Sequence, residues 1–236
     1  QLKNAVNQWV NDINTAIINN GPINRWDVTA VIDMSGIFQG KTTFNTNISN
    51  WDVSAVTNMT SMFENASSFN RDISNWDTSK VKSMESMFKD TSFNQNINTN
   101  DNKWNVSAVT NMAFMFENAS SFNRDISGWN THEVKTMEHM FFNAQNFNQD
   151  ISQWDVSAVT NFTGMFRNAG NFNQDISGWD TGKVNTMQNM FNGAGNFNID
   201  ISQWDISNVN NFNNMFNNTI SLNVDGNINA YEILHS

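Results

Sequence analysis

Apolar residues recur along this chain at fixed positions of a 25-residue repeat. Eight tryptophans mark the repeat, and each lies in a stretch similar to I-S-x-W-D-V-S-x-V-T-N-M-x-x-M-F-x-N-A-x-x-F-N-x-D: Trp26, Trp51, Trp76, Trp104, Trp129, Trp154, Trp179 and Trp204. The interval is 25 residues everywhere except between Trp76 and Trp104, where it is 28. A fixed period of 20–50 residues is typical of a solenoid, in which each unit buries its apolar face against its neighbours.

Within each repeat, positions can be numbered from the tryptophan. Apolar residues occupy positions −3, +2, +5, +8, +11, +12, +15 and +18. All 13 methionines fall at +8 and +11, and phenylalanine dominates +12 and +18. Residues confined so strictly are expected to lie in the interior.

The spacing of these positions predicts two elements per repeat. Around the tryptophan, I-x-x-W-x-V favours a short strand whose alternate residues point inward. From Val56 to Ala66 the intervals are three and four, which favours a short helix or 3₁₀ turn. The predicted fold class is an α/β repeat: a leucine-rich-repeat-like solenoid of about eight to nine strand–helix coils, with the strands in one continuous parallel sheet.

The first residues of the chain differ from the repeat. They carry apolar residues at the spacing of one face of a helix: Leu2, Ala5, Val6, Trp9, Val10, Ile13 and Ile17. The Gly21-Pro22 that follows ends a helix. We expect residues 1–21 to form a capping helix and residues 22–236 to form one elongated repeat domain.

The far end carries a weakened copy of the repeat. Ile228, Tyr231 and Ile233 reproduce I-x-x-W-x-V without a helical return after them. This predicts a weakly capped or uncapped C-terminal edge, and an open edge is a template for pairing, including homo-oligomer formation. The insertion at Asn98–Lys103 predicts a loop.

Composition narrows the range of functions. The formal net charge of −10 argues against nucleic acid as a partner, and no apolar run has the roughly 18–20 residues of a membrane span. The chain has no cysteine, so thiolate chemistry and disulfides are excluded. His132, His139 and His235 are scattered, and no serine stands in G-x-S-x-G. We therefore do not expect an enzyme.

The stretch F-N-x-D-I-S-x-W-D-V-S-x-V-T-N-M-x-x-M-F is similar to the repeat of the bacterial surface protein 26-residue repeat family, the BspA-like leucine-rich-repeat surface proteins. The resemblance covers about residues 22–222, and Leu2–Trp9 looks like the N-terminal cap of that family. It implies a secreted or cell-surface protein, found outside the cell after removal of a signal peptide, that serves adhesion or recognition. Asn105, Asn130 and Tyr231 depart from the pattern.

Two columns of acidic residues are candidates for a calcium site. The position after the tryptophan holds an unbroken run of Asp155, Asp180 and Asp205. The position before the isoleucine holds a second unbroken run of Asp150, Asp175 and Asp200. Ca²⁺ takes carboxylate and carbonyl oxygens. The alternative is that each aspartate accepts a local backbone N–H in a turn, and no other cofactor is expected.

Two further columns are expected to be structural. The asparagine after each phenylalanine of the F-N-x-D stretch predicts a buried hydrogen-bonded ladder, because an amide both donates and accepts. The tryptophans could form a carbohydrate platform, but strand periodicity turns them inward. We expect them in the core.

Two aromatic residues break the template on the exposed side of adjacent repeats: Phe114 at +10 and Phe142 at +13. A pair of exposed apolar residues one coil apart indicates a contact patch. The predicted function is an adhesion or recognition module that binds a protein or glycan on another surface. The alternative is a structural subunit that self-associates into a surface layer, fibre or virion decoration, with Ile228, Tyr231 and Ile233 as its contact edge.

Overall fold

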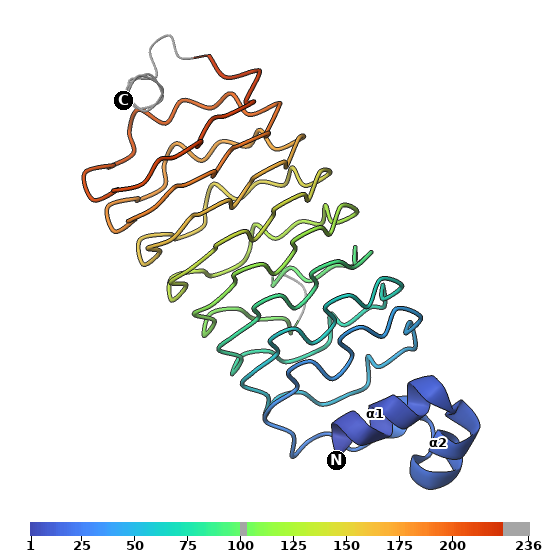
Figure 1. Ribbon diagram of the computed structural model, residues 1–236. Coiled ribbons are helices and arrows are strands. Elements are labelled where there is room, and N and C mark those ends of the chain that lie inside the picture. The colour runs from blue at the N-terminus through green and yellow to red at the C-terminus, as the bar shows by residue number, and fades with distance from the viewer. Residues whose placement is uncertain (100–102, 224–236) are drawn as a thin grey trace.

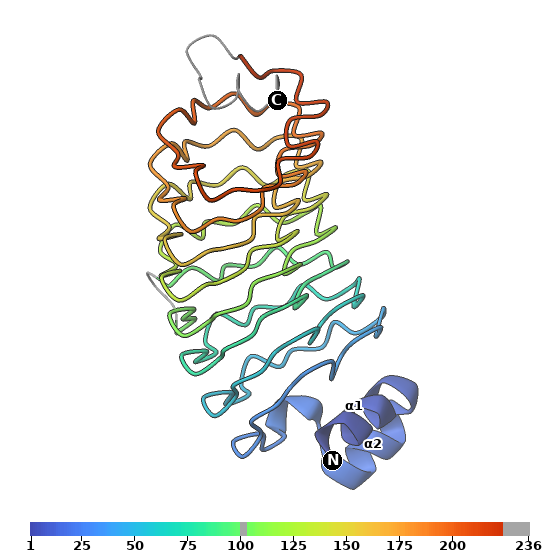
Figure 2. The same cartoon turned by 60° about the vertical axis from the view of Figure 1, so that its left-hand side comes forward.

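The computed structural model describes residues 1–99 and 103–223. Two α-helices, α1 (Leu2–Asn11) and α2 (Ile13–Asn20), and the 3₁₀ helix η1 (Ile23–Arg25) come first. Successive coils then stack in chain order away from these helices, which lie at one end of the molecule (Figure 1). A second view shows the same single stack from another side (Figure 2). Among the described residues no helix is long and apolar enough to span a bilayer.

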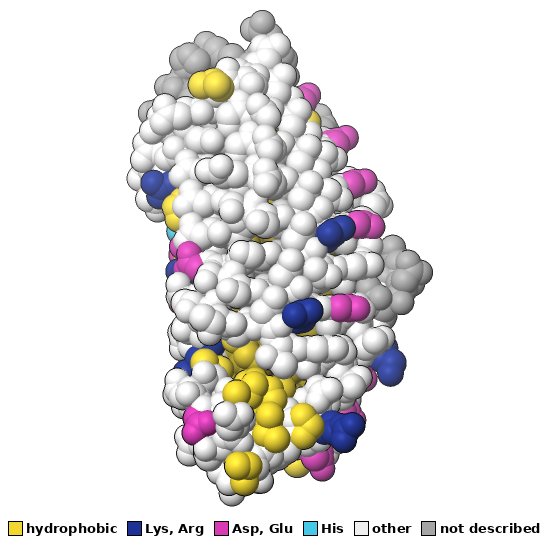
Figure 3. Space-filling model, turned by 90° about the vertical axis from the view of Figure 1, so that its right-hand side faces the viewer, with side chains coloured by type: hydrophobic (Ala, Val, Ile, Leu, Met, Phe, Trp, Pro, Cys, Tyr) yellow, Lys and Arg dark blue, Asp and Glu magenta, His cyan; other side chains and the backbone are white. Residues whose placement is uncertain are grey.

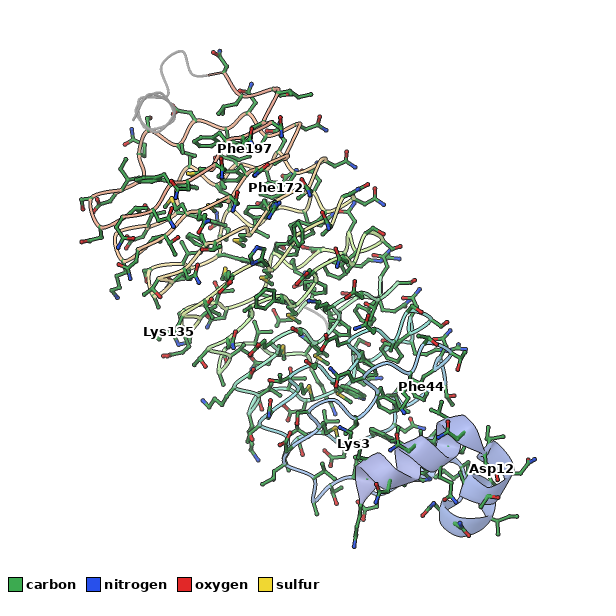
Figure 4. All side chains as sticks on the ribbon, viewed as in Figure 1. Lys3, Asp12, Phe44, Lys135, Phe172 and Phe197 are labelled. Atoms are coloured by element: carbon green, nitrogen blue, oxygen red, sulfur yellow. The ribbon has the colours of Figure 1, made fainter. Side chains whose placement is uncertain are left out.

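The capping segment is two helices, whereas the sequence predicted one. The helical conformation is interrupted at Asp12, where φ is −150°. The Asp12 side chain caps α2 by accepting the N–H of Thr15 at 3.1 Å. Figure 4 shows Asp12 at this break. The break divides the apolar stripe, so Trp9 is buried and packs edge-on against Trp26 at 5.9 Å, while Ile13 is 47% exposed.

The predicted strand–helix solenoid is wrong. Residues 26–99 and 103–223 contain neither a helix nor a strand, and the coils are joined only by isolated parallel bridges at position +7, such as Asn58 with Ser83 and Asn111 with Thr136. No sheet forms. The fold class is instead a repeat of turns.

Each coil is a succession of hydrogen-bonded turns. In the second coil, backbone N–H groups donate to carbonyl oxygens three residues earlier: Trp51 to Ile48, Val56 to Val53, Met62 to Met59, Ala66 to Phe63 and Phe69 to Ala66. The residues at both ends of these five turns are apolar and buried. The three-residue spacing therefore marks the two ends of single turns and does not mark one face of a helix.

Two positions in every coil prevent a helix or strand from continuing. Position +10 has a φ between 51° and 60° in the coils from Gly36 to Asn214, and position +14 has a φ between 56° and 74° from Gly40 to Asn218. Two left-handed residues four positions apart in each coil interrupt both the helical and the extended backbone. The residues are mostly glycine, asparagine and serine, which tolerate that conformation.

Backbone hydrogen bonds also join the coils. The N–H groups at +8, +10, +12 and +14 donate to the following coil, as in Met59 to Ser83 and Ser61 to Glu85. The N–H at +6 donates to the preceding coil, as in Thr57 to Ile32. Each coil thus depends on its neighbours for its backbone hydrogen bonds.

The core is a stack of aromatic rings, as the sequence predicted. Trp51 through Trp204 are at most 3% exposed. Phenylalanines at +12 and +18 stack within a coil, as Phe166 does on Phe172 at 3.9 Å, and also between coils, as Phe172 does on Phe197 at 6.3 Å (Figure 4). Most indole N–H groups donate to the isoleucine carbonyl of the preceding coil.

The insertion disturbs this arrangement locally. Nε1 of Trp104, the first tryptophan after it, is buried without a hydrogen-bond partner among the described residues. Trp129 keeps the usual partner, the isoleucine carbonyl of the preceding coil, which is Ile97 at 2.8 Å and lies 32 residues earlier because of the inserted residues. Within the described residues, the fourth coil therefore lacks the indole hydrogen bond that the fifth coil keeps.

Candidate interaction surface

The aspartates after the tryptophans stabilise turns. Asp155 Oδ1 accepts the N–H of Ser157 at 3.0 Å, and Asp180 and Asp205 accept the N–H two residues on in the same way. Asn105 replaces the aspartate and accepts the N–H of Ser107 at 2.8 Å. An amide oxygen thus accepts the same turn hydrogen bond as a carboxylate oxygen, which explains why asparagine can replace aspartate at this position.

The second acidic column has the same geometry. Asp150, Asp175 and Asp200 each accept the N–H of the serine two residues later, at 2.9, 3.0 and 2.9 Å. In residues 1–99 and 103–223, no group of three or more His, Cys, Asp or Glu side chains is arranged to hold a metal ion. The predicted turn role has this direct support, and calcium binding stays a prediction from the sequence.

Hydrogen bonding shifts the titration of several of these carboxyls. For Asp52, Asp155 and Asp205, the side chain of the serine two residues on, followed by its backbone N–H, lowers the pKa below the ordinary aspartate value. Each bond favours the charged form, since an ionised carboxylate only accepts.

The predicted asparagine ladder is present. The backbone N–H of the asparagine donates to the side-chain oxygen of the asparagine in the preceding coil, as Asn70 does to Asn45 Oδ1 at 3.1 Å and Asn148 does to Asn123 Oδ1 at 3.0 Å. The prediction of burial is wrong, however, since Asn70 is half-buried and Asn123 is exposed.

The structure brings the two unusual phenylalanines together through a histidine. The rings of Phe114 and His139 stack at 5.3 Å with an interplanar angle of 9°, and Phe142 contacts His139 edge-on at 5.5 Å. All three side chains are half-buried. They come from two adjacent coils and form one continuous aromatic surface.

Cations flank this aromatic surface. Lys89 Nζ lies 5.6 Å from the Phe114 ring centre and pairs with Glu117 at 3.0 Å. The Arg167 guanidinium lies 5.3 Å from the Phe142 ring centre. Among the described residues Arg167 forms no ion pair, and its Nε is buried without a hydrogen-bond partner. We call Lys89, Phe114, His139, Phe142 and Arg167 the aromatic–cation cluster.

Backbone conformation makes this cluster unusual. Phe114 and His139 hold φ values of 60° and 51°, a region that bulky side chains rarely adopt. Gly164, one coil further, leaves room for the His139 ring, because a Cβ there would lie 2.5 Å from it. Strained residues of this kind concentrate at functional sites.

The sequence indicated part of this surface. Phe114 and Phe142 stood out as apolar residues at polar positions, but His139, Lys89 and Arg167 did not. The only available signal for His139 was the glycine at the same position in the next repeat. Ile228, Tyr231 and Ile233, the predicted C-terminal contact edge, lie outside the described residues.

A comparison with protein families finds one that covers nearly the whole chain. The family is described as "Mycoplasma protein of unknown function, DUF285", and it matches residues 4–103, 98–194 and 151–235. The chain belongs to DUF285. Searches of curated proteins and of solved structures found no match.

DUF285 membership shows that this is a repeat protein, with the family pattern found three times along the chain. It does not identify the BspA-like proteins in particular. That finer resemblance, and the surface role it implies, stay predictions.

Proposed function

We propose that this chain is a recognition module that binds a protein partner through the aromatic–cation cluster. The supporting observation is that two bulky residues, Phe114 and His139, hold left-handed backbone conformations with their side chains only half-buried. Each such residue costs about 1–3 kcal/mol. Serine, glycine or asparagine fills the same position in the other coils, so stacking the coils does not require an aromatic residue there.

The chemistry of the cluster favours a protein partner. Binding hot spots are enriched in aromatic residues and arginine. Phe114 and Phe142 offer apolar surface, and Arg167 offers a cation without an ion pair among the described residues. A partner that presents a carboxylate beside an apolar side chain would match both groups. A location on the cell surface is part of the proposal and rests on the sequence resemblance.

A paired variant tests this proposal. Phe114→Asn and Phe142→Asn introduce the residues that the structure already holds at the same positions, Asn189 and Asn192. Because the chain has no cysteine, a single cysteine at Asn192, one coil beyond Arg167, can carry a photo-crosslinker. The same probe at Gln203, beside Trp204, serves as the control.

With the cluster intact, we expect a crosslinked partner at position 192 and none at 203. The double variant should lose the adduct and keep the circular dichroism spectrum and melting temperature of the parent. Equal adducts at both positions, or an adduct that survives in the double variant, would contradict the proposal.

A specific observation keeps self-association as a second candidate. On α2, Ile13, Ile17 and Ile18 are 47%, 44% and 82% exposed, and hydrophobic side chains gather at the end of the molecule that carries the helices (Figure 3). Sedimentation across a concentration series tests this candidate. If self-association is the function, the parent sediments as an oligomer and Ile18→Lys sediments as a monomer.

A further inference from the structure

A groove lined entirely by amides and glycines crosses three coils at the edge of the stack. Its volume is about 390 Å³, and its lining consists of four asparagines, one glutamine and two glycines, including Asn143, Gln145, Asn168 and Gly193. A volume of this size falls within the range of small-ligand sites. The lining holds no charged, aliphatic or aromatic side chain, and it does not include the aromatic–cation cluster.

A chain of side-chain hydrogen bonds leads into this groove along position +14. Asn118 Nδ2 donates to Asp90 Oδ1 at 2.8 Å, Asn143 Nδ2 to Asn118 Oδ1 at 2.7 Å, and Asn168 Nδ2 to Asn143 Oδ1 at 2.8 Å. We call these four residues the amide ladder. Because an ionised aspartate can only accept, Asp90 fixes the orientation of every amide after it.

The last acceptor of the ladder is Asn168 Oδ1, which lies beside Gly193. A Cβ at Gly193 would lie 2.2 Å from Asn168 Oδ1, so that oxygen occupies space that a side chain fills in other coils. Within the described residues, no hydrogen bond to Asn168 Oδ1 is formed. Hydrogen bonds in a chain polarise one another, and this chain starts at a carboxylate. Asn168 Oδ1 is therefore a strong acceptor that faces the groove.

We propose that the groove binds a neutral saccharide, one hydroxyl of which donates to Asn168 Oδ1. Sugar hydroxyls donate and accept, as the amides around the groove do, and an uncharged lining does not favour an acidic sugar. An extended peptide could also donate an N–H, but peptide recognition relies on pockets for alternate side chains. The groove has no apolar wall to form them. The proposal is independent of the aromatic–cation cluster.

The probes are chitohexaose and maltohexaose as neutral saccharides, sialyllactose as a charged sugar, and hexaglycine as a peptide backbone. Binding is followed by ¹⁵N chemical shifts of the full chain up to about 10 mM ligand, which detects dissociation constants in the millimolar range. We expect a neutral saccharide to give saturable shifts at Asn143, Asn168 and Gly193. Binding of hexaglycine alone, tighter binding of sialyllactose, or no saturable shift with either hexasaccharide overturns the proposal.

Substitutions at matched positions separate binding from folding. Gly193→Asn introduces asparagine, the residue that Asn143 and Asn218 provide at position +14 of their coils, where φ is also positive. The side-chain amide of the new asparagine can donate to Asn168 Oδ1. Because the added Cβ would lie 2.2 Å from Asn168 Oδ1, the Asn168 side chain has to shift. We expect at least 10-fold weaker binding, with the chain still folded and at most a small fall in melting temperature. Gly40→Asn makes the same change at the same position far from the groove, where φ is 70° and no atom lies within 4 Å of the added Cβ, and it should leave binding unchanged.

A third variant tests the ladder itself. Asp90→Asn lies outside the groove and removes the carboxylate that orients the amides, so binding should weaken several-fold with the fold intact. If Gly193→Asn binds the saccharide as well as the parent does, Asn168 Oδ1 is not the acceptor and the proposal fails.

Discussion

Phe114 and His139 show how one residue depends on the next coil. Their left-handed conformations are unfavourable for large side chains. Stacking of the two rings offsets part of this cost, since aromatic pairs contribute about 0.5–1.5 kcal/mol. The stack fits only because Gly164 has no side chain.

Gly164→Ala should therefore destabilise the protein more than Gly36→Ala does. Both glycines occupy position +10 with φ near 60°, so the backbone cost is shared. At Gly164 the new Cβ meets the His139 ring at 2.5 Å, whereas at Gly36 it meets the flexible Gln39 side chain at 3.2 Å. We expect an additional loss of about 1–3 kcal/mol for Gly164→Ala, measured by urea unfolding. Equal losses would show that the His139 ring moves aside freely.

The indole hydrogen bond can be measured with a pair of tryptophans. Trp154 Nε1 donates to the Ile126 carbonyl at 3.1 Å, and Trp104 Nε1 is buried without a partner among the described residues. Both indoles are buried and lie against a phenylalanine, and Trp154 also stacks on Trp129. Only Trp154→Phe removes a hydrogen bond. Trp154→Phe should cost about 1–2 kcal/mol more than Trp104→Phe in denaturant titrations. A larger loss at Trp104 would contradict this account.

At the scale of the element, the unit is the hydrogen-bonded turn. Carbonyl and N–H groups three residues apart close each turn, and the remaining N–H groups reach adjacent coils. This arrangement satisfies the backbone without a helix or a strand. It requires left-handed residues at +10 and +14, which is why small and polar residues dominate there.

Ser61 offers a test of that requirement. Its φ is 55°, so Ser61→Gly should leave stability unchanged or raise it slightly. Ser61→Val should lower stability by about 1–2 kcal/mol, because a β-branched side chain clashes with the backbone in the left-handed region. Chemical denaturation of the three proteins measures the difference. If valine is tolerated as well as glycine, the left-handed turn is not required at this position.

At the scale of the molecule, acidic side chains run in rows along the stack, and Figure 3 shows one such row along an edge. The aspartates of one row, among them Asp52, Asp155 and Asp205, accept turn hydrogen bonds in their own coils. A repeat protein multiplies a local effect by the number of its coils. The pH dependence of folding should therefore come from many similar carboxyls.

We expect stability to fall under acid conditions. Because hydrogen bonds lower the pKa of Asp52, Asp155 and Asp205 in the folded chain, their contribution is present above the unfolded pKa of about 3.9 and is lost as pH falls through the lower folded values. A triple variant with asparagine at these positions keeps the acceptor oxygens, as Asn105 does. Its melting temperature should fall less than that of the parent between neutral pH and about pH 3. Parallel curves for the two proteins would contradict the prediction.

The sequence by itself determined the 25-residue period, the stacking of the repeats, the buried tryptophan, methionine and phenylalanine positions, and the turn role of the aspartates. These features depend on which residues avoid water and on hydrogen bonds within two residues, so the local pattern contains them. It also pointed to Phe114 and Phe142, because an aromatic residue at a polar position is visible in a single repeat.

Only the tertiary structure decided between a strand or helix and a string of turns. A three-residue apolar spacing fits a helix and a turn equally well. Which of the two forms depends on whether the backbone N–H groups donate within their own coil or to an adjacent coil. The same holds for the surface, because His139 meets Phe114 across coils and the amide ladder ends at Gly193. Contacts between residues about 25 positions apart are set by how the coils stack in register, and that register is a property of the whole fold.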